Sequence, residues 1–527
     1  MIPLERLLVE NCNVLNPTGE SAVRSILVEG MKIVKVSANP TQKAPEGMTM
    51  TTIDARGGTV LPGLIDTHCH LVALGSMRRI LDLTGTSNVT ALRLRLFAKA
   101  NKAPPGEWVM GRGWDQEGFT ERRYPSRDDI DDLTRDNPVI LTRVCGHVAL
   151  LNSVAMNRLG IDEAAANEGG RVFDRDESGR LTGIIRELAV EEALGGIRPP
   201  NDEVIEADIL AGEYEAAKSG LTSLHCILSS NYEQELRAFI SLHSKRKLAL
   251  RYRIYLPAAG LKRLEGPEFG QPVEDDGMLK ILGVKVFADG SLGARTAALR
   301  EPYSDDPTNS GILRYTGGQL EEILGKAHSL GKQVLIHAIG DAAVSQAIDA
   351  IVSVTRGKNE WRHRIEHCSL CTAETMERLK EAEIGVSVQP HFAISDTWAS
   401  ERLGERRIKW LYPLKSLLKN GVTASGGSDA PVEPVSPILG MWAAMVGANY
   451  SAEERLDIKE ALRLYTINAA FNGFNEGNLG EIREGFLADL TILDSDIRDI
   501  HPAMLRKVGV AATVVNGRVA YSYEGVP

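Results

Sequence analysis

The sequence predicts an α/β fold built on a TIM-like (β/α)8 barrel, and two observations support this class. Apolar runs with strand character recur between residues 59 and 429, and amphipathic helical stretches separate several of them, which is the alternation that such barrels require. Side chains with metal-binding or acid–base chemistry stand at the ends of these runs, where parallel barrels keep their active sites. The eight expected strands are residues 59–70, 221–228, 248–256, 281–288, 333–338, 363–368, 385–389 and 423–429.

Three helices are predicted between the later strands. In residues 318–330 the apolar side chains recur at the 3.6-residue spacing of one helix face, and residues 343–354 repeat the pattern. Thr372 is well suited to N-cap a third helix that runs through Met376 and Leu379. Each helix would connect two parallel strands, as a barrel needs.

One connection is far longer than the others. About 150 residues separate His70 from Leu221, several times the length of a normal crossover. Residues 76–205 include short strand-like runs at 108–110 and 139–144, glycine-rich turns, tryptophan and many aliphatic residues. We therefore expect this segment to fold as an inserted α+β lobe after the first barrel strand, lying over the active-site mouth.

The two ends of the chain are expected to fold together. Both contain short β-like runs interrupted by turns, and Val515-Asn516-Gly517-Arg518-Val519 has the Asn-Gly pair of a two-residue hairpin. The predicted domains are a composite β-sandwich from residues 1–60 and 480–527, the barrel from residues 61–75 and 206–479, and the inserted lobe.

The composition is that of an ordinary globular protein. Of the 527 residues, 43% are hydrophobic and 25% are charged, and the net charge of −10 disfavours nucleic acid or an anionic membrane as the main partner. No secretory signal opens the sequence, and no apolar run reaches the roughly 18 residues of a membrane span. The six cysteines show no disulfide pattern, so we expect a cytoplasmic protein with reduced thiols.

The strongest functional signal is a set of six side chains at or near strand ends. His68 and His70 alternate along the first strand and therefore point to one face. Further ligand-type residues follow on later strands, and a lysine stands inside the fourth. Because the C-terminal ends of parallel barrel strands meet at one mouth, we expect a metal site there. The remaining members are Lys285, His337, His367 and Asp429.

Lys285 is the most unusual member of this set. An ammonium has no lone pair and cannot bind a metal, but burial and nearby cations favour the neutral amine. A neutral amine can add carbon dioxide and become a carbamate, which can bridge two divalent ions roughly 3.5–4 Å apart. The alternative is that Lys285 forms a buried salt bridge with Asp289 or Asp429.

Ordered sequence blocks along nearly the whole chain carry a family resemblance. The chain resembles the amidohydrolase superfamily, in the amidohydrolase-3 branch that includes N-substituted formamide deformylases. The matching blocks are LPGLIDTHCH at 61–70, GRGWD at 111–115, GHVALLNS at 146–153, KVFADGSLG at 285–293, HAIGD at 337–341, RIEH at 364–367, GSDAP at 427–431, and GEI with GFLADL at 480–490.

This resemblance implies a ligand set. One ion would take His68, His70, Asp429 and the carboxylated Lys285, and the other would take Lys285 with His337 and His367. Zinc is favoured for imidazole and oxygen ligands, with manganese, iron and cobalt as alternatives. A homodimer is common among such enzymes.

The implied function is a metal-dependent hydrolase that cleaves a non-peptide, amide-like C–N bond of a small molecule with a metal-activated hydroxide. Asp429 would take the proton of the water and pass it to the leaving nitrogen. Four further residues are candidates for contact with the substrate, and each also has a purely structural interpretation. They are His391, His147, Arg295 and Trp114.

Three other functions remain open from the sequence. A deaminase on the same barrel uses one metal and a nearby glutamate, but no glutamate closely follows His337, and Lys285 would then have no role. A phosphotriesterase or lactonase shares the bridged two-metal design. A non-enzymatic scaffold would be expected to have lost some of the six ligands.

Overall fold

The computed structural model describes residues 6–20, 24–38, 50–143, 148–167, 171–197, 200–266, 277–447 and 451–523. The chain forms two compact units. The larger one combines Met1–Leu74 with Ile205–Pro527, and the smaller one is Gly75–Val204. The chain ends and the barrel thus share one compact unit, and the long connection forms its own.

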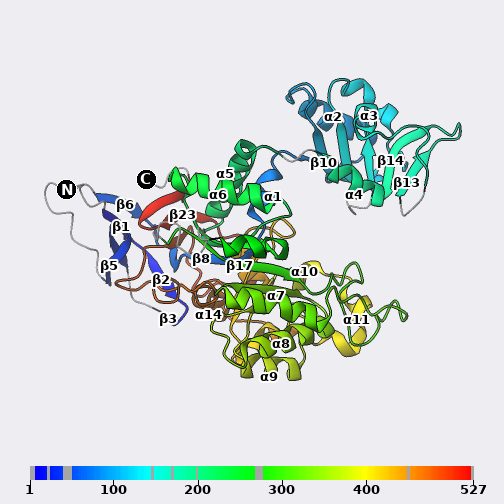
Figure 1. Cartoon of the computed structure of the whole chain (residues 1–527). Coiled ribbons are helices and arrows are strands. Elements are labelled where there is room, and N and C mark those ends of the chain that lie inside the picture. The colour runs from blue at the N-terminus through cyan, green and yellow to red at the C-terminus, as the bar shows by residue number, and fades with distance from the viewer. Residues whose placement is uncertain are drawn as a thin grey trace. The chain divides into compact units, whose positions relative to one another are not determined.

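The core of the larger unit is an eight-stranded sheet whose paired strands all run parallel, in the order β21-β20-β19-β18-β17-β16-β15-β8. Backbone hydrogen bonds join its two edges, from Asp429 N to His68 O (2.7 Å) and from His70 N to Ala430 O (2.9 Å). The predicted (β/α)8 barrel is therefore confirmed (Figure 1). Its strands are β8 (Leu64–Cys69), β15 (Leu221–Ile227), β16 (Arg251–Pro257), β17 (Leu279–Phe287), β18 (Gln333–Ala338), β19 (Arg364–His367), β20 (Gly385–Val388) and β21 (Ala424–Gly426).

The first expected strand is in fact two strands, which corrects the prediction for residues 59–70. β7 (Thr59–Pro62) pairs with a C-terminal strand, and β8 begins after Gly63. A Cβ at Gly63 would lie 2.3 Å from Thr222 Oγ1, so only glycine fits where the chain passes from one sheet to the other. The apolar pattern hides this break because both halves are buried.

Helices cover the barrel and confirm the three predicted segments as α7, α8 and α9. Thr372 caps α9 by accepting a hydrogen bond from Thr375 N, as expected. Their inward residues, including Leu324, Ile348 and Met376, belong to the same apolar core as the barrel strands. The helices around the barrel are α5 (Asp202–Lys218), α6 (Tyr232–Ser244), α7 (Gly317–Ser329), α8 (Asp341–Thr355), α9 (Ala373–Glu381), α10 (Phe392–Ser395), α11 (Ala399–Ile408), α12 (Leu414–Lys419), α13 (Pro437–Val446), α14 (Ile458–Leu464) and α15 (Ile467–Asn472).

The two chain ends share a six-stranded sheet, in the order β24-β23-β22-β7-β2-β3, next to a four-stranded sheet in the order β5-β4-β1-β6. Asn516 and Gly517 have φ of 51° and 72°, as the predicted two-residue hairpin requires. The strands are β1 (Arg6–Glu10), β2 (Asn13–Asn16), β3 (Gly19–Glu20), β4 (Ser25–Glu29), β5 (Lys32–Ser37), β6 (Met50–Asp54), β22 (Leu490–Leu493), β23 (Val510–Val515) and β24 (Arg518–Ser522).

The smaller unit is an α+β structure around a six-stranded sheet, in the order β13-β14-β12-β11-β10-β9. Its location over the barrel mouth stays a prediction. Its main elements are β9 (Leu81–Asp82), α2 (Val89–Ala100), β10 (Val109–Trp114), β11 (Val139–Arg143), β12 (Val148–Leu151), α3 (Ser153–Leu159), β13 (Arg171–Arg175), β14 (Leu181–Glu187) and α4 (Leu188–Gly195).

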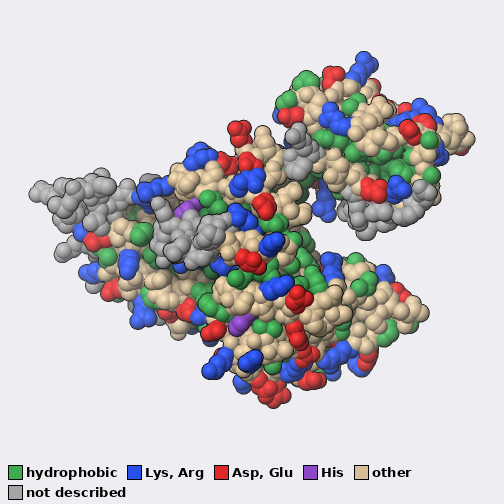
Figure 2. Space-filling view, in the orientation of Figure 1, with side chains coloured by type: hydrophobic (Ala, Val, Ile, Leu, Met, Phe, Trp, Pro, Cys, Tyr) green, Lys and Arg blue, Asp and Glu red, His purple; other side chains and the backbone are tan. Residues whose placement is uncertain are grey.

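The described surface mixes charges of both signs. Figure 2 shows acidic and basic side chains interspersed on the face in view. Among the described helices, none is long and apolar enough to cross a membrane. The five described cysteines are buried free thiols.

Candidate metal centre

The structure brings the six predicted ligands to the C-terminal end of the barrel. His68 and His367 stand at the ends of β8 and β19, and His337 lies near the end of β18. Lys285 lies within β17, His70 directly follows β8, and Asp429 lies in the loop that follows β21. This common location follows from the parallel sheet, which turns the same end of every strand to the same mouth.

Three of these residues form a compact ligand cluster. His68, His70 and Asp429 each offer an atom, and these atoms lie within 4.8 Å of one another. Asp429 Oδ1 is 3.3 Å from His68 Nε2 and 3.2 Å from His70 Nε2. Burial would raise the pKa of Asp429, but His68 and His70 outweigh burial and hold this pKa well below its usual range. The cluster therefore presents an anionic oxygen and two imidazoles, which suits a divalent ion.

His337 and His367 complete a second group beside the first. Their ring centroids are 4.4 Å apart, and His367 is 4.9 Å from His68. His367 Nδ1 donates to Gln389 Oε1 at 2.6 Å, so its Nε2 keeps a free lone pair. His337 Nε2 donates to Gly290 O at 2.9 Å, and its buried Nδ1 has no hydrogen-bond partner among the described residues.

Both of these imidazoles are held neutral. Burial, followed by the nearby Lys285, lowers the pKa of His337 to about 3. Burial, followed by the nearby His337, lowers the pKa of His367 well below its usual value. A neutral imidazole is the form that binds a metal.

Lys285 is buried with 1% of its surface exposed, and in the described part of the chain its Nζ also has no hydrogen-bond partner. Burial lowers its pKa to about 8, which increases the share of neutral amine. Asp289 does not pair with it, because the Asp289 carboxylate accepts hydrogen bonds from Ala298 N, Ile339 N and Gly340 N. The ion pairs of the described residues do not join Lys285 to Asp429 either. An unpartnered amine beside an unpartnered imidazole nitrogen is costly, and both groups fit a site built for metal ions.

Two ligand positions have an unusual backbone. His367 has φ of 69° and Asp429 has φ of 56°, in the left-handed region that residues with a Cβ rarely adopt. Such conformations cost about 1–3 kcal/mol each and concentrate at functional sites. Here one lies at the end of β19 and the other in the loop that follows β21.

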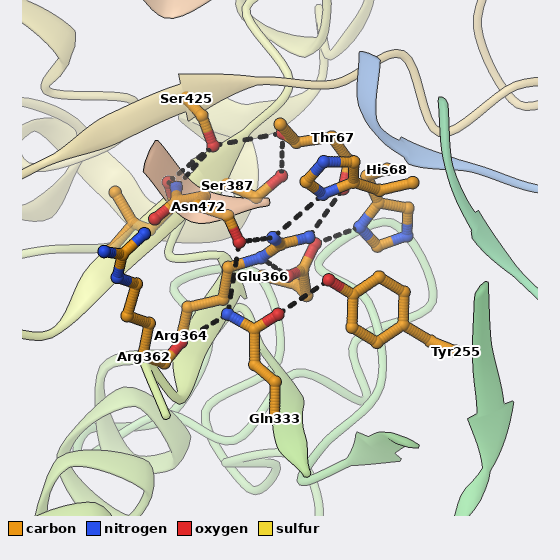
Figure 3. Close-up of polar contacts among 12 residues, drawn as sticks. Thr67, His68, Tyr255, Gln333, Arg362, Arg364, Glu366, Ser387, Ser425 and Asn472 are labelled. Atoms are coloured by element: carbon orange, nitrogen blue, oxygen red, sulfur yellow. Dashed lines mark hydrogen bonds and ion pairs between the residues drawn. The ribbon is translucent and has the colours of Figure 1, made fainter. Parts of the chain in front are cut away.

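Sequence reasoning missed Glu366 and Arg364, which support the ligands from below. Glu366 accepts a hydrogen bond from His68 Nδ1 at 2.5 Å, and Arg364 lies behind it (Figure 3). Burial would raise the pKa of Glu366, but Arg364 and His68 outweigh burial and hold it well below its usual range. The available signal was the pair of charged residues at alternate positions of an expected strand, which places both on one face. His225 also belongs to this layer, through its contact with Arg364.

The four substrate-contact candidates have different environments. His391 follows β20, and its Nδ1 contacts the carboxylate of Glu433, in the loop after β21. Arg295 lies in the loop after β17, where its guanidinium forms an ion pair with Asp305 at 2.9 Å. His147 lies outside the described residues.

The assignment of Trp114 to substrate contact is corrected by the structure. Its side chain is fully buried in the core of the smaller unit, and its Nε1 donates to Leu141 O at 2.7 Å. An indole that is buried and hydrogen-bonded in this way supports the fold rather than a binding surface.

Comparisons with known proteins agree with this geometry. A model of the Amidohydrolase family matches residues 51–521. The chain is 32% identical over 489 residues to "Putative amidohydrolase YtcJ" of Bacillus subtilis (strain 168), covering 89% of this chain and 90% of that protein. It is 26% identical to the N-substituted formamide deformylase of Arthrobacter pascens, over the full length of both chains.

A solved structure extends the agreement to three dimensions. An uncharacterized metal-dependent hydrolase from Pyrococcus furiosus matches with a TM-score of 0.77 at 32% identity, covering 92% of this chain and 97% of that one. The family match, these similarities and the histidine-rich barrel mouth together show that this chain belongs to the amidohydrolase family and is a metal-dependent hydrolase.

Proposed function

We propose that the enzyme hydrolyses an amide-like, non-peptide C–N bond of a small molecule at a two-ion site. The ligands are His68, His70, Asp429, His337 and His367, with Lys285 carboxylated as the bridge and zinc as the favoured metal. The observation that carries the proposal is the pair of buried atoms without hydrogen-bond partners in the described structure, Lys285 Nζ and His337 Nδ1, beside the cluster of His68, His70 and Asp429.

The carbamate explains why a lysine stands at this position. Carboxylation would remove the cost of a buried amine without a hydrogen-bond partner and would supply a carboxylate on a long stem as a ligand for the ions. When bound, divalent ions supply Lewis acidity that polarises a substrate carbonyl and lowers the pKa of water.

The chain itself supplies the proton transfer. Asp429 has one oxygen within 3.3 Å of two ligand histidines and remains ionised, so its carboxylate can accept a proton from the attacking water. The same group then donates that proton to the leaving nitrogen.

A C–N bond is favoured by the full-length relative from Arthrobacter pascens, which bears the name of a formamide deformylase. A phosphotriesterase or lactonase activity would use the same ligands and remains the second candidate. A mononuclear deaminase accounts less well for the structure, because it leaves Lys285 buried without a function.

The test is a substrate screen on protein loaded with Zn²⁺, Mn²⁺ or Co²⁺ and analysed for metal content. The panel contains N-formyl and N-acyl amines, cyclic amides, carbamates, carboxylic esters, lactones and phosphotriesters. We expect about two ions per chain and turnover confined to the C–N substrates. Turnover of esters or phosphotriesters alone would refute the bond assignment, and one ion per chain in the active protein would refute the bridged site.

A further inference from the structure

An ion pair without any access to solvent lies below the ligand cluster. Arg364 and Glu366 both belong to β19 and face the barrel interior, and both are 0% exposed. Arg364 Nε donates to Glu366 Oε1 at 2.7 Å. Burying two charges costs about as much as their attraction returns, so such a pair is weak evidence for a role in stability.

The pair contacts two consecutive residues of β8. Glu366 Oε2 accepts from His68 Nδ1 at 2.5 Å, and Arg364 Nη2 donates to Thr67 O at 2.7 Å. β8 and β19 are not neighbours in the sheet, so these contacts cross the barrel interior, as Figure 3 shows. The same ion pair thus binds the side chain of His68 and the backbone carbonyl of the residue before it.

The guanidinium is itself held by further contacts. Arg364 Nη1 lies 3.1 Å from His225 Nδ1, a neutral imidazole nitrogen that accepts the hydrogen bond, and 3.4 Å from Asn472 O. The ring of Tyr255 lies 5.5 Å from the guanidinium carbon. Contacts to Glu366, Thr67 and these groups leave the guanidinium little freedom to move.

The hydrogen bond to Glu366 decides which nitrogen of His68 can bind a metal. A carboxylate only accepts, so His68 Nδ1 must carry the proton and Nε2 must present the lone pair. It is Nε2 that lies 3.3 Å from Asp429 Oδ1, inside the ligand cluster. Rotation of the His68 ring would break the bond to Glu366.

We infer that Glu366 and Arg364 are positioning residues of the metal centre. Glu366 orients the His68 ring with Nε2 toward the metal. Arg364 binds both the Glu366 carboxylate and the β8 backbone, and so fixes their positions relative to each other. This inference rests on the proposed metal site. It assigns the buried pair to metal affinity rather than to fold stability alone.

The test measures metal binding rather than turnover. Metal-free wild-type protein and Glu366→Gln are titrated with Co²⁺, and the visible spectrum of the bound ion is recorded together with the dissociation constant. Glu366→Gln keeps the size of the side chain but removes the charge that holds Arg364 and His68. We expect Co²⁺ affinity to fall by roughly 10–100-fold and the spectrum to change, as is typical when a partner of a ligand histidine is lost.

Asp489→Asn is the matched control. Asp489 forms another buried ion pair with an arginine, Arg251, at 2.6 Å. Arg251 begins β16, so this pair lies at the end of the barrel opposite the ligands. Its loss should lower thermal stability while leaving Co²⁺ affinity and spectrum within about twofold of wild type. An equal loss of affinity in both variants would show that the effect is general destabilisation and would overturn the inference.

Glu366→Asp covers the case in which Glu366→Gln does not fold. It keeps the countercharge for Arg364 but shortens the side chain, so the bond to His68 Nδ1 is weakened and affinity should fall by a smaller factor. Wild-type affinity and spectrum in every folded Glu366 variant would overturn the inference. Failure of the wild-type protein to bind Co²⁺ would instead refute the proposed metal site.

Discussion

Replacing Lys285 by methionine should separate the effect of this residue on the stability of the metal-free fold from its contribution to metal binding. Methionine has a similar length and volume and adapts to irregular space. In the metal-free protein the substitution removes a buried amine that has no hydrogen-bond partner among the described residues. In the metal-loaded protein it removes the bridging ligand. We therefore expect stability to change in opposite directions in the two states.

The size of each effect follows from the burial of this amine and from the linkage between metal binding and folding. An unsatisfied buried polar group costs about 1–3 kcal/mol, so metal-free Lys285→Met should be more stable by up to that amount. Metal at 100 times its dissociation constant stabilises the wild type by about 2.7 kcal/mol. With an unfolding entropy of roughly 2.1 cal/mol/K per residue, the larger unit responds by about 1 °C per kcal/mol.

The assay is differential scanning fluorimetry with and without Zn²⁺, combined with elemental analysis. We expect the metal-free Tm of Lys285→Met to rise by roughly 1–4 °C, and its gain on adding Zn²⁺ to be less than half of the wild-type gain of about 3 °C. Lys332→Met is the matched control, because Lys332 is a partly buried lysine of the same barrel with a backbone contact to Ile281 O. Its response to Zn²⁺ should equal that of wild type.

A Lys285→Met protein that binds two ions per chain with the full gain in Tm would refute the bridging role. A metal-free Lys285→Met protein that unfolds earlier than wild type would show that the amine makes a favourable interaction in the metal-free state, contrary to its assignment as an unsatisfied group.

Asp429→Asn should lower kcat by at least about 10²–10⁴-fold because it removes the proton carrier, with metal content by elemental analysis largely retained; substantial remaining turnover would contradict the assignment. Burial and the neighbouring His328 lower the pKa of His363 to about 3. As the pH falls, His363 therefore takes up a proton in the unfolded chain at a higher pH than in the folded one. This difference should lower the free energy of unfolding of the wild type below pH ~6.5, by about 2 kcal/mol at pH 5. The free energy of unfolding of His363→Gln, measured in urea, should lack this part of the pH dependence. If it varied with pH between about pH 5 and pH 7 as steeply as in the wild type, the role given to His363 would be contradicted. Gly63→Ala should lower the free energy of unfolding by at least about 1–3 kcal/mol, because its Cβ would lie 2.3 Å from Thr222 Oγ1. Gly317→Ala is the control: a Cβ there has no atom within 4 Å, so the change should be nearly neutral in the same unfolding assay.

Much of the architecture could be predicted from local pattern. Most barrel strands are short buried runs, and helices such as α8 repeat their apolar residues at the spacing of one helix face, so both signals lie within a few residues of sequence. The hairpin at Asn516-Gly517 is equally local. The break at Gly63 escaped because the residues on both sides are buried, and burial alone does not reveal which sheet a strand joins.

The candidate ligands were also visible in the sequence, because their chemistry is unusual for their positions. A lysine inside a buried strand and two histidines at alternate positions are costly arrangements unless they are used. The substrate-contact candidates lacked such a signal. Trp114 looks the same in the sequence whether it lines a pocket or fills a core, and only its burial and its bond to Leu141 O distinguish the two.

Local sequence was enough to infer the barrel class, the alternation of strands and helices, and the residue types that gather at the strand ends. Which nitrogen of each histidine is free could be read only from the folded chain, because it depends on partners distant in sequence: Glu366 for His68, Gly290 for His337 and Gln389 for His367. Local pattern is set by neighbours along the chain, whereas the orientation of an imidazole is set by the hydrogen bond that its other nitrogen makes to a different strand or loop.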